Sequence, residues 1–183
     1  MRPGDPPILW SWTFAHLPDI ANRIVEHLVL TGIAVGVGFV IAFVLSLFIR
    51  QLPVLYSPIT WVAGVLYSIP SLALFALLIP FTGLSIVTAE IGLISYTLLI
   101  LIRNIVSGFR SVPPDVRESA VGMGYSQWQM LWHIELPLAT SVIIAGVRVA
   151  VVTTIGLVTV TGVIGQGGLG ALILQGIQQF FAT

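Results

Sequence analysis

Two long stretches of this chain contain no charged residue, one from Gln51 to Ala89 and one from Val149 to Thr183. The chain as a whole is 57% hydrophobic and 8% charged, with a mean hydropathy of +1.05. Soluble domains carry about 25% charged residues, and a membrane-spanning helix needs about 20 consecutive apolar residues. The sequence therefore predicts an all-α polytopic membrane protein.

Four apolar segments have the length of a membrane span. We place them near Leu28 to Ile49, Val54 to Phe81, Ile86 to Phe109 and Leu138 to Ile164. Pro70 lies inside the second segment, and a proline interrupts the hydrogen-bond ladder of a helix. We therefore expect a kink or a break in the second span.

Several classes of function find no support in the sequence. The chain has no cysteine, so disulfide and thiol chemistry are excluded, and its net charge of zero gives no nucleic-acid footprint. The histidines lie far apart and the central carboxylates fall on different expected elements, without the spacing of a metal site or an acid–base pair. These residues are His16, His27, His133, Glu90, Glu118 and Glu135. We expect no catalytic site, no metal and no cofactor.

Polar residues concentrate in the segment 110–137, between the third and fourth spans. Pro113 and Pro114 suit the first turn of a short helix, and Gly124 suits a left-handed stop at its end. Ser126 with Gln129 three residues later has the pattern of a capping box that begins a second helix. The segment therefore predicts two short helices joined at a glycine.

The first of these helices has a face suited to docking. Val116, Ala120 and Met123 fall on one side at helical spacing, and Ser119 and Ala120 are small enough to let a partner approach closely. An ordinary amphipathic connector between two spans is the alternative.

The loop also matches a known pattern. Glu118-Ser119-Ala120-Val121-Gly122-Met123-Gly124, followed nine residues later by Ile134-Glu135-Leu136-Pro137, resembles the cytoplasmic signature loop of the membrane subunits of bacterial ABC importers, which docks on the ATPase subunit. Ser119 stands where that family usually has alanine. The resemblance implies an ATPase-coupling role for Glu118, Ser119, Ala120, Gly124, Ile134, Leu136 and Pro137.

Further motifs resemble one branch of these importers, the permeases for glycine betaine, choline, carnitine and related osmoprotectants. They are Tyr67–Leu74, Ile102–Asn104, Glu135–Ala139, Ala145–Arg148 and Ile164–Gly170. The branch has a type I core of five spans, so the resemblance implies that four are visible here and that the final core helix is missing. Alternatives are a permease for another small solute, such as an amino acid or related amine, and a membrane assembly protein outside the ABC class.

The resemblance also implies partners: ABC ATPase subunits that hydrolyse ATP, a second permease copy or a paralogue, and an extracytoplasmic substrate-binding protein or domain. It implies a non-enzymatic transport subunit of a bacterial or archaeal cytoplasmic membrane. The signature loop would then face the cytoplasm.

Arginine placement predicts the same orientation, because basic residues favour cytoplasmic loops. Arg50, Arg110 and Arg117 mark the two cytoplasmic connections, which puts the N-terminus outside. We expect residues 1–27 to form an external tail whose surface helix begins at Pro18–Asp19, and residues 28–183 to form the transmembrane domain.

The broken second span carries candidate residues of a translocation pathway. Its freed carbonyls near Pro70 need partners, and transporters use such breaks to line cavities. Tyr67, Ser68 and Ser71 flank the break and are candidates with Pro70. The alternative is that the proline only shapes packing.

Two arginines lie at membrane depth. Arg148 is ~16 Å along the helix from Pro137 and therefore has to face protein or water, as a gate or as a structural pair. Arg103 lies ~10 Å from the end of the third span, where it can reach back toward the interface, which favours a structural role over a pathway role.

The glycine-rich segment 162–170 predicts an external turn, followed by a short surface helix with Leu172, Ile173, Ile177 and Phe180 on it. Glu90 is the one acid within the spans, and no cluster of aromatic rings surrounds a carboxylate at membrane depth. We therefore expect the isolated membrane subunits to bind a quaternary ammonium solute weakly.

Overall fold

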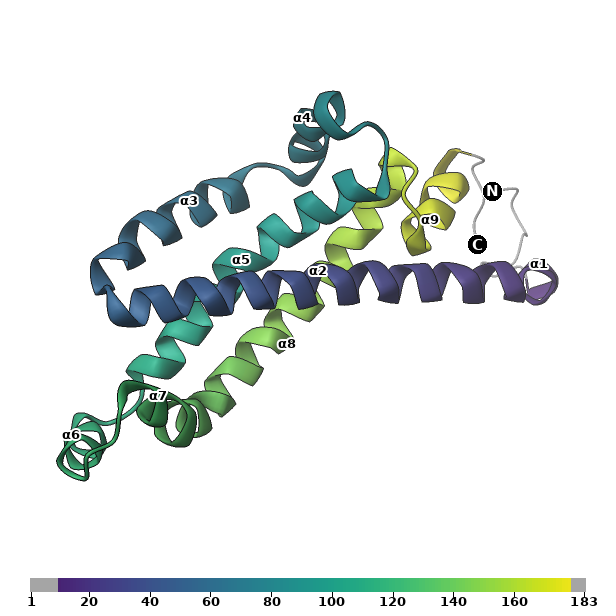
Figure 1. Ribbon diagram of the computed structural model, residues 1–183. Coiled ribbons are helices and arrows are strands. Elements are labelled where there is room, and N and C mark those ends of the chain that lie inside the picture. Colours follow the sequence, from purple (N-terminus) through teal and green to yellow (C-terminus); the bar gives the residue numbers. More distant parts are fainter. Residues whose placement is uncertain (1–9, 179–183) are drawn as a thin grey trace. The chain divides into compact units, whose positions relative to one another are not determined.

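A computed structural model of the chain describes residues 10–178 (Figure 1). Within this range all regular structure is helical, which confirms the expected all-α fold. The α-helices are α1 Trp10–Ala15, α2 Leu17–Gln51, α3 Tyr56–Ser68, α4 Ser71–Thr82, α5 Ile86–Arg110, α6 Pro114–Gly122, α7 Gln127–Met130, α8 Leu136–Thr161 and α9 Gly168–Gln178. Short 3₁₀ turns cover Pro53–Leu55 and Gly162–Ile164, and a π-helical turn covers Leu131–Glu135.

The long helices agree with the expected spans. Among the described residues, α2, α5 and the segment Gln127–Ile164 are each long and apolar enough to cross a membrane. The pair α3 and α4 adds a fourth span when the two are counted as one broken span. By length and composition the described residues therefore contain three spans, and the expected four only if this bent pair is one span.

The second span is broken where the sequence predicts it. α3 ends at Ser68 and α4 begins at Ser71, and Pro70 precedes α4 in an extended conformation with φ −55° and ψ 135°. A proline disfavours the helical conformation at the residue before it, here Ile69, which is consistent with the end of α3 at Ser68. α4 continues through its own Pro80 near its C-terminus.

The N-terminal helix and the first span are one helix. The helix expected to begin at Pro18–Asp19 begins at Leu17 and continues into the span as α2, which runs without a break from Leu17 to Gln51. Pro18 lies in the first turn, where its missing N–H costs little, and no later residue of α2 is a proline. At 1.5 Å per residue the 35 residues extend ~52 Å, which exceeds the ~30 Å hydrocarbon core of a bilayer.

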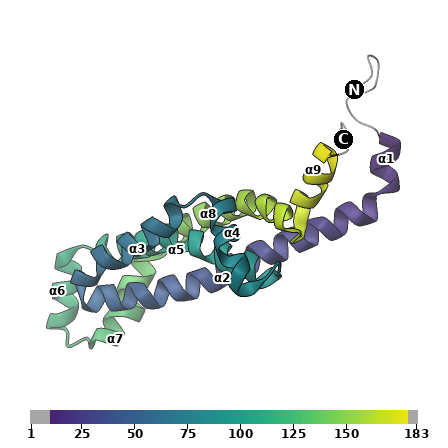
Figure 2. The same cartoon turned by 90° about the horizontal axis from the view of Figure 1, so that it is seen from above.

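Two compact units divide the long helices between them. One consists of Val35–Ser68 and Ile94–Val152. Within it, α3 runs alongside the second half of α2 (Figure 2). Its buried core takes residues from α2, α3, α5 and α8, among them Ala42, Ile49, Ala63, Leu101, Ile102, Ile105, Phe109 and Ala139.

A close helix approach explains one sequence motif in this unit. A β-carbon added at Gly146 of α8 would lie 2.3 Å from Cβ of Asn104 of α5, far inside van der Waals contact. The Asn104 side chain is itself fixed, because its Nδ2 donates to the carbonyl of Ile100 at 2.8 Å. Glycine at position 146 therefore lets α8 pack directly on α5.

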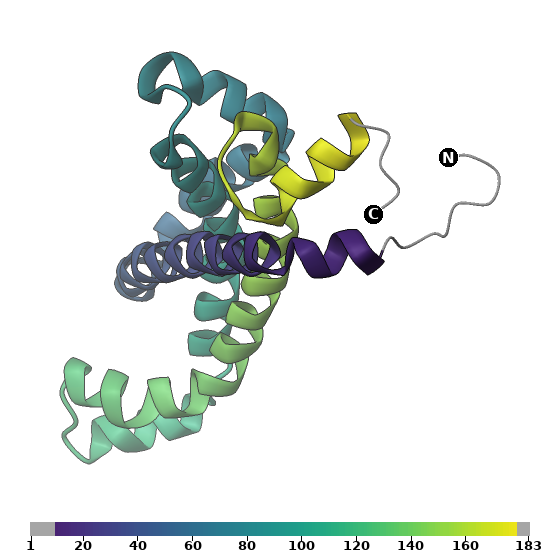
Figure 3. The same ribbon diagram turned by 90° about the vertical axis from the view of Figure 1, so that its right-hand side faces the viewer.

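The other unit consists of the described residues up to Ala34, Ile69–Leu93 and those from Thr153 onward. Its glycine-rich turn joins α8 to α9, and the start of α9 lies beside α2 (Figure 3). The Gly168 N–H donates to Oε2 of Glu26 at 3.1 Å, and the Leu169 N–H donates to Nδ1 of His27 at 3.3 Å. Nε2 of His27 donates to the Ile155 carbonyl at 2.9 Å, so the neutral ring satisfies both contacts.

This turn is more constrained than the sequence indicated. Gly167 and Gly168 have φ of +53° and +69°, a region that other residues rarely occupy. A β-carbon at Gly170 would meet the Thr159 carbonyl oxygen at 1.9 Å. α8 ends at Thr161 and α9 follows, as expected, but the glycines serve close backbone packing as well as turning. Phe180, expected on the short helix after the turn, lies outside the described residues.

Candidate functional site

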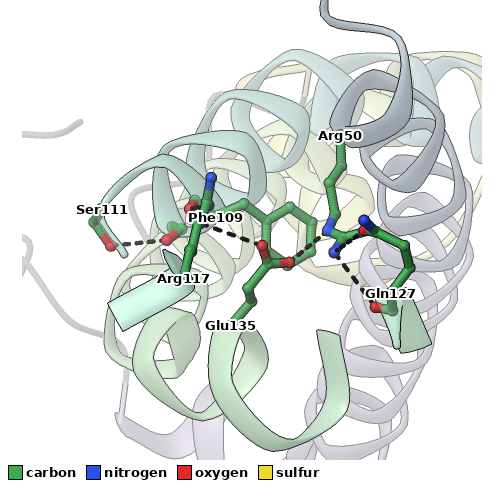
Figure 4. A network of polar contacts seen from close by, with 7 residues as sticks. Arg50, Phe109, Ser111, Arg117, Gln127 and Glu135 are labelled. Carbon is green, nitrogen blue, oxygen red and sulfur yellow. Dashed lines mark hydrogen bonds and ion pairs between the residues drawn. The ribbon is translucent and has the colours of Figure 1, made fainter. Parts of the chain in front are cut away.

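Glu135 is the centre of a buried charge cluster at the base of the loop between α5 and α8 (Figure 4). Its carboxylate is 3% exposed and accepts a hydrogen bond from Nε of Arg50, at the end of α2. Nε of Arg117, in α6, lies 3.3 Å from the second carboxylate oxygen as an ion pair without hydrogen-bond alignment. Two arginines thus share one buried acid.

The two arginines also donate hydrogen bonds to backbone carbonyl groups on either side of the cluster. Nη2 of Arg50 donates to Oε1 of Gln127 at 3.2 Å and to its carbonyl at 3.4 Å, at the start of α7. Nη2 of Arg117 donates to the Phe109 carbonyl at the end of α5. The cluster therefore connects α2, α5, α6 and α7 with the turn that enters α8.

The local sequence explains the shape of the loop. Pro113 precedes α6 with ψ 140°, and Pro114 takes the first helical position. Gly124 has φ +84°, and the N–H groups of Gly124 and Tyr125 close the helix end on the carbonyls of Val121 and Ala120 at 2.9 and 3.0 Å. This is a Schellman end, as the sequence predicts.

The capping box at the second helix is also confirmed. The Ser126 side chain accepts from the Gln129 N–H at 3.3 Å, and Oε1 of Gln129 accepts from the Ser126 N–H at 2.8 Å. The second helix does not stop after one turn. It passes through the π-helical turn Leu131–Glu135 into α8, so α7 and α8 form one continuous helical path.

The π-helical turn is a feature that sequence reasoning missed. Such turns have wider hydrogen-bond spacing and occur often at functional sites. Glu135 is the last residue of the turn, and its side chain is buried against the two arginines. No residue type in Leu131–Glu135 predicts a π-helix. The available signal was Glu135 itself, a single acid in an Ile-Glu-Leu-Pro sequence next to an apolar span.

The tip of the loop exposes large apolar side chains. Val121, Met123 and Trp128 are 63%, 68% and 62% exposed, and Trp132, which follows in the same segment, is also exposed. Large exposed apolar side chains grouped in one segment mark interaction surfaces. We call these four residues the apolar tip.

One expectation for this surface is wrong. Ala120 is 0% exposed, so it packs inside the loop instead of meeting a partner. The other two residues of the predicted face differ from it, because Val116 is half-buried and Met123 is exposed. Ser119 and Glu118 are exposed, and Oγ of Ser119 donates to the Asp115 carbonyl at 2.8 Å. Ile134 and Leu136 are half-buried, and Pro137 is exposed.

A hollow of about 660 Å³ adjoins the charge cluster. It is lined by Arg50, Gln51, Arg117, Val121, Gln127, Met130 and Glu135. Both arginines of the cluster and Val121 of the apolar tip contribute to its wall. The loop therefore offers a partner both a knob of apolar side chains and an adjacent recess with charged walls.

The candidate pathway residues near Pro70 are accessible. Tyr67, Ser68 and Pro70 are exposed and Ser71 is half-buried. Oγ of Ser68 donates to the Val65 carbonyl at 2.8 Å, one of the groups at the end of α3 that the break leaves free. The Tyr67 ring meets the Tyr96 ring edge-on, with centroids 5.8 Å apart.

Arg103 and Arg148 are both exposed on the single chain. Arg103 is on α5 next to Asn104, and Arg148 is on α8 two residues after Gly146. Among residues 10–178, neither guanidinium has a recorded hydrogen bond or ion pair. A charged side chain at membrane depth has to face protein or water instead of lipid.

Among the described residues, no group of three His, Asp or Glu side chains lies close enough to hold a metal ion.

The fold is similar to that of a chain in solved transporter structures. It matches a chain of the MetNI methionine ABC transporter, solved in inward-facing conformations, with a TM-score of 0.76 at 22% sequence identity, over 86% of this chain and 79% of that chain. A second crystal form of the same transporter matches with a TM-score of 0.77 at 20% identity. The chain thus has the fold of an ABC transporter membrane subunit.

Residues 34–183 match the family of binding-protein-dependent transport system inner membrane components, and the chain belongs to this family. It is 39% identical to the osmoprotectant import permease protein OsmW of Salmonella typhimurium, over 86% of this chain and 76% of that protein. It is 36% identical to the carnitine transport permease protein OpuCB of Listeria monocytogenes, over 85% and 71%. The glycine betaine/carnitine/choline permease protein OpuCB of Bacillus subtilis is 32% identical over 85% and 71%.

These findings confirm the resemblance drawn from the motifs. The chain is a multi-pass membrane subunit of a binding-protein-dependent transport system. The alternative of a membrane assembly protein outside this class is excluded.

Proposed function

We propose that the chain is the permease subunit of an ATP-driven importer of quaternary ammonium osmoprotectants, such as glycine betaine, choline or carnitine. The observation that carries this proposal is the similarity to permeases for osmoprotectants, carnitine, and glycine betaine with carnitine and choline, at 32 to 39% identity over most of the chain. A permease for another small solute, an amino acid or a related amine, is the second candidate. We keep this second candidate because a methionine transporter has the same fold.

ATP hydrolysis belongs to separate ATPase subunits in this proposal, and the loop between α5 and α8 docks on them. The coupling residues are Glu118, Ser119, Gly124, Ile134, Leu136 and Pro137, with Ala120 as an internal packing residue. The exposed apolar tip supports docking, because Met123 and Trp128 have nothing to cover them on the single chain. The charge cluster around Glu135 supports force transmission, since it joins the loop to the long helix α2.

The orientation follows from that assignment. The loop and the Arg50 end of α2 face the cytoplasm, and the N-terminus with residues 1–27 lies outside. The arginine distribution supports this, because Arg50, Arg110 and Arg117 are all at one end of the spans. The external end then meets the substrate-binding protein.

Transport requires a second permease chain, identical or paralogous, because four spans do not easily surround a path alone. In the proposed mechanism, ATP closes the ATPase dimer, draws the two coupling loops together and opens the pathway toward the binding protein. The solute leaves inward after hydrolysis. Candidate pathway residues are Tyr67, Ser68, Pro70, Ser71, Arg103 and Arg148, which are at least partly exposed on the single chain.

Uptake measurements in cells test the proposal. The chain and its genomic neighbours are expressed in a bacterial strain that lacks its own betaine, choline and carnitine importers. We expect energy-dependent uptake of at least one labelled quaternary ammonium solute and growth rescue at high salt. Uptake of methionine or another amino acid without any of these solutes would favour the second candidate instead.

A further inference from the structure

Glu90 of α5 is a buried acid without a partner. The residue is 8% exposed, and neither carboxylate oxygen has a hydrogen-bond partner among residues 10–178. A buried carboxylate normally receives hydrogen bonds or an ion pair, because leaving it bare loses its hydration without replacement. Glu135 of the same chain shows the usual solution, with two arginines around one acid.

Among residues 10–178, no neighbouring side chain supplies the missing partner. The basic residue that lines the same recess is Arg23, and its guanidinium is paired with Glu26 at 2.9 Å. Glu26 also accepts from the Gly168 N–H, which fixes it in place. The chain contains no lysine. The pair Arg23–Glu26 is neutral overall, so among the described residues the recess holds no cation that is free to pair with Glu90.

Glu90 lines a pocket of about 400 Å³, within the size range of small-molecule sites. Most of the wall is aliphatic and comes from Val29, Leu30 and Ile33 of α2 and from Ile86 of α5. Gln166 and Gly167 of the glycine-rich turn close one side. All of these residues belong to one compact unit. The pocket therefore joins one bare carboxylate to a mainly apolar enclosure.

The chemistry of this enclosure selects among cations. A divalent metal takes six or more oxygen ligands, and a primary ammonium has three N–H donors to satisfy. Glu90 is the one acid in the wall that is not already paired. A quaternary ammonium has no N–H donor and a shell of methyl groups, so it requires charge neutralisation and apolar contact, both of which are present.

We propose that Glu90 and its pocket form a transient binding site for the quaternary ammonium group of the transported solute. The inference rests on the proposed function. The site lies on the external side in the proposed orientation, so it receives solute released by the binding protein. Its wall contains one unpaired acid and no aromatic ring, so binding is weak, as expected for a pathway that has to release its solute.

The test uses the assembled complex of permease and ATPase subunits in nanodiscs, without the binding protein. Choline binding is measured by saturation-transfer NMR and compared with 3,3-dimethyl-1-butanol, its uncharged carbon analogue, at matched ionic strength in sodium chloride. We expect choline to bind in the millimolar range and the analogue to bind at least about tenfold more weakly, because only choline is attracted by the carboxylate.

Glu90→Gln is the test variant, since it keeps the shape and removes the charge. It should abolish the preference for choline over its analogue. Asp19→Asn is the matched control, because Asp19 is an exposed acid in the first turn of α2 and is not part of the pocket wall. The control should bind as the wild type does. A thermal melt without ligand checks folding, and Glu90→Gln should melt no lower than wild type, because no bare charge remains.

Three outcomes would overturn the inference. They are equal binding of choline and its analogue in wild type, unchanged choline binding in Glu90→Gln, and complete competition by sodium ions, which would make the pocket an inorganic cation site. The failure of the proposed function looks different: Glu90-dependent choline binding would persist while the complete importer moved no quaternary ammonium solute.

Discussion

Arg50 at the end of α2 and Glu135 at the entrance to α8 form a buried ion pair across 85 residues of sequence. Their side chains are 13% and 3% exposed, so water screens the pair little. Glu135 is also the acid that holds Arg117 of α6. This one carboxylate therefore connects the loop between α5 and α8 to the end of α2 and the start of α8.

Removing the acid leaves two arginines facing each other in a buried site. Glu135→Ala should lower the free energy of unfolding by about 3–5 kcal/mol, the usual cost of breaking a buried pair from one side. Thermal unfolding of the purified complex in detergent measures this. Glu118→Ala is the control, because Glu118 is exposed and should change stability by less than about 0.5 kcal/mol. Equal melting of both variants would contradict the role of the cluster.

Gly124 is the hinge residue between α6 and α7. Its φ of +84° costs other L-residues about 1–2 kcal/mol, and a β-branched side chain suffers most. Gly124→Val should therefore displace the apolar tip while the protein still inserts and assembles. Transport and substrate-stimulated ATPase should fall together in reconstituted complexes.

The control for this hinge is Gly122→Ala, at the last residue of α6. An added β-carbon there meets no atom within 4 Å, and helical φ tolerates alanine. Normal coupling in Gly122→Ala and lost coupling in Gly124→Val is the expected pair of results. Full coupling in Gly124→Val would refute the docking geometry.

Gly146 sets the distance between α5 and α8. Gly146→Val places carbon 2.3 Å from Cβ of Asn104, so the helices have to separate, at a cost of about 1–3 kcal/mol. Gly156→Ala on the same helix has open space and should be neutral or slightly stabilising, since alanine favours helix. Melting temperatures of the two variants check this. A stable Gly146→Val protein would show that the contact is loose.

A substitution at Arg148 distinguishes a gate role of this residue from a structural role. Arg148→Gln keeps hydrogen-bonding capacity and deletes the charge. Because the side chain is exposed on the single chain, we expect nearly unchanged thermal stability and an altered transport rate. A less stable complex whose surviving molecules turn over normally would show that Arg148 is a structural residue.

Local chemistry made much of this protein predictable from sequence. Pro70 breaks the second span, Gly124 takes the left-handed conformation, and Ser126 with Gln129 forms the capping box, because each depends on neighbouring residues alone. The family also followed from motif spacing in the loop.

What escaped prediction depends on contacts between distant segments. The inward turn of Ala120, the pairing of Arg50 with Glu135 and the contact of Gly146 with Asn104 all require knowing which helices pack together. The carboxyl of Glu90 is similar, because only the packed structure shows that it has no hydrogen-bond partner among residues 10–178. The sequence singles out Glu90 as the one acid within the spans but does not show that it is buried without a partner.

Site-specific cross-linking tests the central claim most directly, because the chain has no natural cysteine. Ser119→Cys places a thiol on the exposed surface of α6, and Leu84→Cys places one in the exposed connection between α4 and α5. With a short thiol-to-amine cross-linker in assembled complexes, we predict that Ser119→Cys joins the permease to the ATPase subunit and that Leu84→Cys does not. Cross-linking of the ATPase subunit from Leu84→Cys, with none from Ser119→Cys, would contradict both the docking surface and the orientation.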